Sequence, residues 1–299
     1  MKKSLVFATA LAGMLALAPA ALVSAADNTA NTKGDITFET DDQTTTPIVT
    51  PPDPGKETKP DGGGNGTPGA LRIDFAPDLH FGIQKITSTN QDYKPVQQAG
   101  TATDGSGTRS YMPNFVQITD NRGLAATDPT AGWTLALKQE AQFANGTNNL
   151  DGAALSFTNN QFITRDATGA VVAAPTGYTS PANVTLTPGT AATLATADNT
   201  TAGTVQEIWN TTNTLTPIDA TNDLKDTTGA DKTDDAFKTA FTAAPKDDGI
   251  NLNVPGATHK VKGAYTTDLT WTLSATVANT GAAAGTTTPA TTGTGTTTP

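Results

Sequence analysis

The chain has 299 residues, with 18 lysines and arginines against 28 aspartates and glutamates, a net charge of −10 and no cysteine. So acidic a chain lacks the positive charge that binds nucleic acid or anionic lipid, and we expect neither partner. Without cysteine it has no disulfide framework and no thiol to carry a lipoprotein's acyl anchor.

The N-terminus has the pattern of a secretory signal. Two lysines precede an apolar run over residues 5–17, and small residues suited to cleavage follow at 23–25. A bilayer span needs about 20 apolar residues, so a retained membrane anchor is the weaker alternative. Residues 1–25 are therefore predicted to be a signal peptide. Its removal takes away two lysines and no acid, and the mature chain, starting near Ala26, has a net charge of −12.

Residues 26–69 are predicted to be a leader and a Pro/Gly-rich linker. Within the leader, residues 34–39 are a candidate for a short isolated strand. The stretch T-P-I-V-T-P-P-D-P-G-K-E-T-K-P favours extended polyproline II, and D-G-G-G-N-G-T-P-G after it is flexible. Neither composition can bury a core, so we expect a disordered linker.

Residues 70–279 are predicted to form one all-β domain. In L-R-I-D-F, at residues 71–75, odd positions are apolar and even positions charged, which is the period-two pattern of a half-buried strand. Similar alternation recurs at residues 114–118, 154–157 and 251–254. Many short strands separated by turn residues favour a sandwich or barrel-like domain of antiparallel strands.

One segment of this domain is predicted to be helical, as a minor insertion. Thr233 is a suitable N-cap, two aspartates favour the first turn, and Phe237 and Phe241 lie four residues apart on one face. A helix is therefore expected over residues 234–244. After the domain, residues 280–299 form a threonine- and glycine-rich tail that we expect to be disordered.

The triplet Trp-Thr-Leu occurs twice in a chain that has 3 tryptophans. It stands in G-W-T-L-A-L and, near the end of the domain, in L-T-W-T-L-S. Residues i and i+2 of a strand point to the same face, so Trp133 shares a face with Leu135 and Trp271 shares a face with Leu273.

Two interpretations of these four residues follow. A tryptophan–leucine stripe flanked by polar residues usually fills a sandwich core, and burial is favoured on this ground. Alternatively, the two strands lie side by side and Trp133, Leu135, Trp271 and Leu273 form a binding site, with the rings exposed or half-buried beneath a shallow groove. Trp209 lacks the pattern and is assigned to ordinary packing.

Further stretches carry a family resemblance. They are residues 79–86, residues 113–123 running into the first triplet, and residues 252–256 and 262–266 before the second. Together with the order of signal, Pro-Asp-Pro linker and domain, they resemble the WxL-domain surface proteins of low-GC Gram-positive bacteria. The resemblance covers nearly all the mature chain, with residues 79–86 similar to the family's opening strand. The tail departs from the family pattern, which usually ends soon after the second triplet.

The resemblance implies a secreted protein that attaches non-covalently to the cell wall through residues 70–279, with peptidoglycan as ligand. It also implies partners among other WxL proteins and a membrane-anchored surface protein. The alternative functions are a structural subunit or an adhesin of a multi-protein surface complex, binding partner proteins or host matrix. The sequence contains no L-P-x-T-G sorting motif, which agrees with a non-covalent attachment.

No pattern in the sequence indicates catalysis, a metal or a cofactor, and we expect no enzyme. His80 and His259 are the 2 histidines, and neither has metal-ligand or triad spacing. The pairs Asp234-Asp235 and Asp247-Asp248 fall at a helix start and a turn, where aspartate is expected. The acidic run at 219–235 lacks the spacing of a calcium loop, although weak surface binding of calcium stays an alternative.

A mature chain of charge −12 is repelled by an anionic wall, so attachment must depend on local contacts. We expect aromatic rings against sugar faces and hydrogen bonds from threonine and asparagine. Lys260 and Lys262 are expected to add a small basic patch, because they share one face of the segment before the second triplet.

Overall fold

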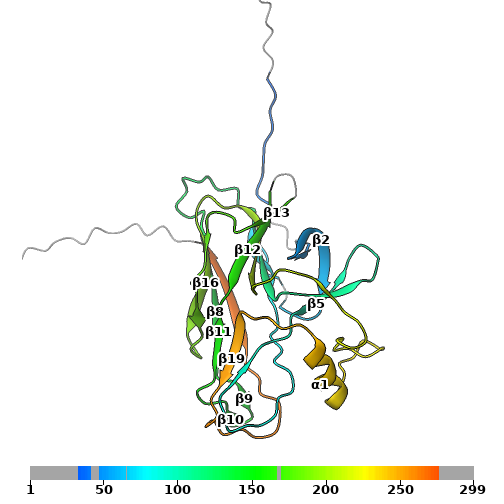
Figure 1. Ribbon diagram of the computed structural model, residues 1–299. Coiled ribbons are helices and arrows are strands. Elements are labelled where there is room, and N and C mark those ends of the chain that lie inside the picture. Colours follow the sequence, from blue (N-terminus) through cyan, green and yellow to red (C-terminus); the bar gives the residue numbers. More distant parts are fainter. Residues whose placement is uncertain (1–32, 42–46, 65, 167–169, 276–299) are drawn as a thin grey trace, which may run out of the picture. The chain divides into compact units, whose positions relative to one another are not determined.

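The computed structural model describes residues 33–41, 47–64, 66–166 and 170–275 (Figure 1). The predicted signal peptide and tail lie outside these residues. The chain divides into two units after Phe38, and the described part of the first unit, residues 33–38, contains no strand. The isolated strand expected at 34–39 is therefore absent, and Ile36 and Phe38 are exposed.

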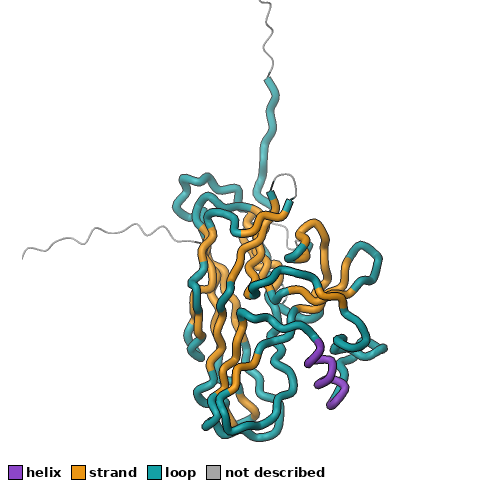
Figure 2. Tube along the Cα trace, in the orientation of Figure 1, coloured by secondary structure: helices purple, strands orange, loops and turns teal. Residues whose placement is uncertain are grey.

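The second unit consists almost entirely of antiparallel strands, with one helix in its described residues (Figure 2). This confirms the predicted all-β class with a helical insertion. The helix, α1, spans Asp234–Ala243. No helix among the described residues is long and apolar enough to cross a membrane.

Two sheets form the main sandwich. The central sheet has the order β13-β12-β17-β7-β3, with bounds Val171–Ala173, Asn160–Arg165, Gly203–Trp209, Phe115–Asp120 and Leu71–Phe75. The motif sheet has the order β14-β16-β8-β20, with bounds Tyr178–Thr179, Ala191–Ala197, Trp133–Gln139 and Leu269–Ala275.

Further strands extend this sandwich. The β19 sheet has the order β15-β11-β19-β4, with bounds Val184–Thr185, Ala154–Phe157, Ile250–Val254 and Gln91–Tyr93. The N-terminal sheet has the order β1-β2-β5-β6-β18, with bounds Val49–Thr50, Asp53–Pro60, Gln98–Ala102, Arg109–Met112 and Thr216–Pro217. A short hairpin pairs β9, Ala144–Asn145, with β10, Asn148–Asn149.

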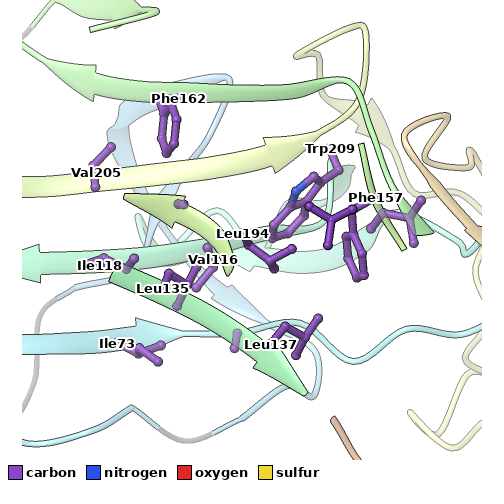
Figure 3. Close-up of a cluster of buried hydrophobic side chains, with 14 of the residues drawn as sticks. Ile73, Val116, Ile118, Leu135, Leu137, Phe157, Phe162, Leu194, Val205 and Trp209 are labelled. Atoms are coloured by element: carbon purple, nitrogen blue, oxygen red, sulfur yellow. The ribbon is translucent and has the colours of Figure 1, made fainter. Parts of the chain in front are cut away.

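The main hydrophobic core lies between the central sheet and the motif and β19 sheets. Val116 and Ile118 of β7 meet Leu135 and Leu137 of β8, and all four side chains are buried. Figure 3 shows these side chains gathered with residues from neighbouring strands, among them Leu194 of β16.

The alternation predicted at 154–157 marks residues that face this core, Leu155 and Phe157. The alternation at 251–254 marks residues of a separate cluster, Leu252 and Val254.

The central sheet is covered on its other face as well. A second cluster, which includes Phe115, Ile163 and Ile208, packs on that face, so every residue of β7 is buried. Strand β7 was predicted to be buried on one face only, but the structure buries both of its faces. In β3 the charged pair Arg72 and Asp74 is buried too, and Arg72 Nε donates a hydrogen bond to Asp74 at 3.0 Å.

The predicted linker contains two strands, β1 and β2, and the expectation of disorder there was wrong. Two buried side-chain amides of the central sheet hydrogen-bond the backbone at residues 47–49, where these strands begin. Gln117 Nε2 donates to Pro47 O at 3.0 Å, and Gln206 Nε2 donates to Val49 O at 2.6 Å. Strand β2 then pairs with β5. Composition could not indicate this, because the hydrogen-bond partners lie far away in sequence.

Helix α1 forms where it was predicted. Thr233 occupies the N-cap position without a side-chain capping hydrogen bond, and Phe237 stacks on Phe241 with ring centroids 6.0 Å apart. Phe241 and Ala244 pack against Val96 and Tyr111, which attaches the helix to the N-terminal sheet.

Two of the buried carboxyl groups, those of Glu207 and Asp247, have strongly raised pKa values. Glu207 of β17 accepts a hydrogen bond from Ser180 Oγ at 2.7 Å, and Asp247, expected in a turn, is buried and accepts one from the Asn114 amide at 2.8 Å. Removal from water disfavours the charged form, so burial raises the pKa of each carboxyl to about 8.

Because the pKa values of Glu207 and Asp247 are raised in the folded state, we predict that the free energy of unfolding falls as pH rises. The folded pKa of about 8 exceeds the ordinary values of 4.5 for Glu207 and 3.8 for Asp247, so between these limits the folded state holds protons that the unfolded state releases. For each group the free energy of unfolding declines by about 1.4 kcal/mol per pH unit through that window. Urea unfolding measured from pH 4 to 9 checks this.

Glu207→Gln and Asp247→Asn should each flatten the decline. The exposed Glu140, whose pKa is lowered mainly by its hydrogen bond from Lys138, supplies the control Glu140→Gln, which should leave the decline in place. Profiles for the two buried-site variants that run parallel to the wild type would rule out this origin of the pH dependence.

Candidate functional site

The two Trp-Thr-Leu strands lie side by side. Strands β8 and β20 pair antiparallel along their length, with Leu273 opposite Leu135 and Trp271 opposite Leu137. The expectation that the two triplets occupy neighbouring strands is thus confirmed. The two strands are neighbours because β20, the last strand of the described chain, pairs with β8 from the middle of the sequence.

The two copies of the triplet have different surroundings. Strand β8 has neighbours on both sides, β16 and β20, and Trp133 and Leu135 are 1% and 0% exposed. Strand β20 is an edge strand within the described residues, and Trp271 and Leu273 are only partly buried. In this structure a ligand can reach the second copy, whereas the first copy supports β20 from inside the core.

The indole rings of the two triplets are not paired with each other. Trp133 lies opposite Ala275, and the nearest ring recorded beside it is that of Tyr178, with centroids 5.9 Å apart. Trp271 instead contacts Trp209, with centroids 5.8 Å apart and planes inclined by 39°. The aromatic pair at the candidate site is therefore Trp271 with Trp209. Trp209 is itself 1% exposed and belongs to the main core, which confirms its assignment to packing, and it contacts Trp271 from there.

Trp271 also lines a large open groove, of about 1950 Å³. One wall is residues 76–87, which follow β3, and another is residues 260–268, which lead into β20. Helix α1 contributes Phe237 and Phe241. Local sequence patterns could not predict the groove, because many segments far apart in the chain line it.

The wall at residues 76–87 corrects one expectation from the family resemblance. Residues 79–86, compared with an opening strand, contain no strand in the structure. Gly82 has a φ of 73°, and a Cβ built on it would lie 2.6 Å from the Phe241 ring. Glycine thus allows this segment to turn and to approach the helix closely.

Of the two lysines expected to form a basic patch, Lys262 is exposed, whereas the ammonium group of Lys260 is bound within the protein. The Lys260 ammonium donates to four backbone carbonyls, those of Thr87, Pro255, Gly256 and Thr258, at 3.0 to 3.4 Å. It therefore ties residues 76–87 to the loop before β20 and has few donors left for a ligand.

No cluster of His, Asp and Glu suited to a metal ion occurs among the described residues. His80 and His259 are both exposed, and His80 stands on the wall of the groove. Trp271 is part-buried, and aromatic, apolar and hydroxyl-bearing residues line the groove with it.

Comparison with known proteins identifies a family. The model of the WxL domain, described as surface cell wall-binding, matches residues 25–276. No curated protein and no solved structure shows a significant match. The matched region includes every strand of the structure, both Trp-Thr-Leu triplets and the walls of the groove.

The difference in burial predicts different costs of truncation. Trp133→Ala should lower the free energy of unfolding by about 3–5 kcal/mol, since a fully buried ring leaves a cavity. Trp271→Ala should cost less, about 1–2 kcal/mol, because part of its ring is already exposed to solvent. Urea unfolding measures both, with Thr272→Ala on the exposed face of β20 as control. Equal losses for the two tryptophans would contradict the assignment of different roles.

Proposed function

The chain belongs to the WxL family of surface cell wall-binding proteins, and from this membership we propose that it attaches to the wall without a covalent bond by binding peptidoglycan. The family match is the observation that carries the proposal. The proposed contact is the surface formed by Trp271 and Leu273 on β20, with Trp133 and Leu135 of β8 as their support.

The geometry of β20 suits a carbohydrate ligand. The Trp271 ring is partly exposed and is backed by Trp209, so little of its position has to be fixed on binding. Thr266 and Thr267 line the same groove as Trp271 and carry hydroxyl groups. Aromatic rings pack on sugar faces, and hydroxyls supply hydrogen bonds, so neither contact requires an attractive net charge.

A second candidate function is a subunit of a surface complex, with other WxL proteins or a membrane-anchored protein as partners. The observation that favours it is the edge position of β20 among the described residues. An edge strand offers unpaired backbone groups to which a partner can add a strand. An adhesin for host matrix has no comparable feature in its favour.

The mode of attachment predicts how the protein leaves the wall. Treatment of walls with lithium chloride or strong denaturant should release the mature protein intact, starting near Ala26, because no covalent bond has to be broken. Mass spectrometry of the released protein checks both points. Protein that survives on walls boiled in detergent would contradict non-covalent attachment.

The proposed contact predicts the outcome of sedimentation with purified peptidoglycan. Trp271→Leu, which keeps apolar packing but removes the aromatic face, should weaken binding about tenfold, whereas Trp271→Phe should largely retain it. Added salt should leave binding to peptidoglycan unchanged or strengthen it, since screening weakens the repulsion of an acidic protein. Melting temperatures of both variants serve as the control.

Two results would redirect the proposal. If Trp271→Leu binds peptidoglycan as well as Trp271→Phe does, the aromatic face of β20 is not the contact. If the wild-type protein does not bind peptidoglycan at all but co-purifies with other WxL proteins, the subunit function takes precedence.

A further inference from the structure

The groove beside Trp271 concentrates positive charge in an otherwise acidic protein. Six lysines line it, out of 18 lysines and arginines in the chain, whereas three of the 28 acidic residues do. They are Lys85, Lys232, Lys238, Lys246, Lys260 and Lys262. The groove thus has a formal excess of positive charge, although the whole chain has a net charge of −10.

Four of these ammonium groups already have partners. The carbonyls around Lys260 hold it, Lys246 donates to Ala244 O at 2.6 Å and lies 4.1 Å from the centre of the Phe241 ring, and Lys238 pairs with Asp235 at 2.9 Å. Lys232 donates to Ala220 O at 3.2 Å. These contacts fix the shape of the groove more than they attract a ligand.

Lys85 and Lys262 are different. Both are exposed, and neither ammonium has a hydrogen bond or an ion pair with the part of the chain that the structure describes. Lys85 lies on the wall at residues 76–87, and Lys262 lies on the wall at residues 260–268. Lys260 joins these walls by donating a hydrogen bond to the carbonyl of Thr87, so both lysines are within two residues of the junction. The junction is therefore flanked by two unpaired positive charges.

The free cations of the groove suit an anionic ligand. Arginine's planar fork binds carboxylates and phosphates in a fixed geometry, whereas lysine is a point charge that binds phosphate oxygens without one fixed orientation. None of the described groove residues is an arginine, and three of the four arginines pair with aspartates elsewhere. Phe81, Tyr265 and Trp271 line the same groove and offer apolar surface for a carbon backbone.

We propose that this groove binds a phosphodiester-linked anionic polymer of the cell wall, with Lys85 and Lys262 as the phosphate contacts. The inference rests on the proposed wall attachment and adds a second ligand to it. Repulsion from the acidic remainder of the protein restricts such a polymer to the groove, so the contact is local even though the net charge is unfavourable.

The test compares the full chain on two kinds of wall: intact walls, and walls from which cold hydrofluoric acid has removed phosphodiester-linked polymers while leaving peptidoglycan. Lys85→Glu/Lys262→Glu is the groove variant. The matched control is Lys33→Glu/Lys59→Glu, two exposed lysines that do not line the groove. Each pair of substitutions lowers the net charge from −10 to −14, so general repulsion is equal in the two variants.

The wild type should bind intact walls about thirtyfold more tightly than stripped walls, since each of the two lysines contributes about one kcal/mol of attraction near an anionic surface. The groove variant should lose this difference, and the control variant should keep it. Added salt should weaken binding to intact walls alone. In solution, polyglycerol phosphate should compete for the wild type, and polyglutamate, which carries carboxylates, should compete less.

The outcomes separate this inference from the proposal on which it rests. Equal binding of the wild type to both kinds of wall overturns the groove inference and leaves peptidoglycan attachment intact. Equal losses in the groove and control variants also overturn it, because net charge then explains the effect. Binding to intact walls alone, lost in the groove variant, supports the groove and removes peptidoglycan as the ligand. Binding to neither wall overturns both.

Discussion

The pairing of β8 with β20 is the constraint on which the site depends. It brings the end of the described chain against an interior strand whose apolar face is completely buried. Because β8 has neighbours on both sides and β20 has one in the described residues, the same triplet is core in one strand and part of the surface in the other. Trp133 is buried in the strand that supports β20, where Trp271 is partly exposed.

A second constraint comes from the polar residues of the central sheet. Gln117, Thr119 and Asp74 are buried, and each unsatisfied polar group in such a place costs about 1–3 kcal/mol. These groups find hydrogen-bond partners both within the sheet and outside it. Thr119 Oγ1 donates to Asp74 at 2.6 Å, and Gln117 Nε2 donates to the carbonyl of Pro47, before β1. The N-terminal strands therefore complete the domain rather than merely precede it.

The distribution of charge explains how an acidic protein can present a basic groove. Lysines whose ammonium groups bind backbone carbonyls, Lys246 and Lys260, hold the walls together, and the same walls then position Lys85 and Lys262 at their surface. Burial lowers the pKa of Lys246 to about 8, so this group is near titration under mildly alkaline conditions.

The sequence by itself determined the all-β class, the helix at α1 and the core-facing side of the strand at 154–157, because these depend on local periodicity and capping. The two triplets and their flanking stretches also determined the family. Local patterns do not specify which strand lies at an edge or which distant segments meet. Only the tertiary structure therefore decided that Trp271 is partly exposed and Trp133 is not, and that Trp209 contacts the Trp271 ring. It also decided that segments far apart in the chain enclose a lysine-rich groove. Each of these depends on contacts between residues far apart in the chain, and burial and hydrogen bonding choose among such contacts only when the whole domain has folded.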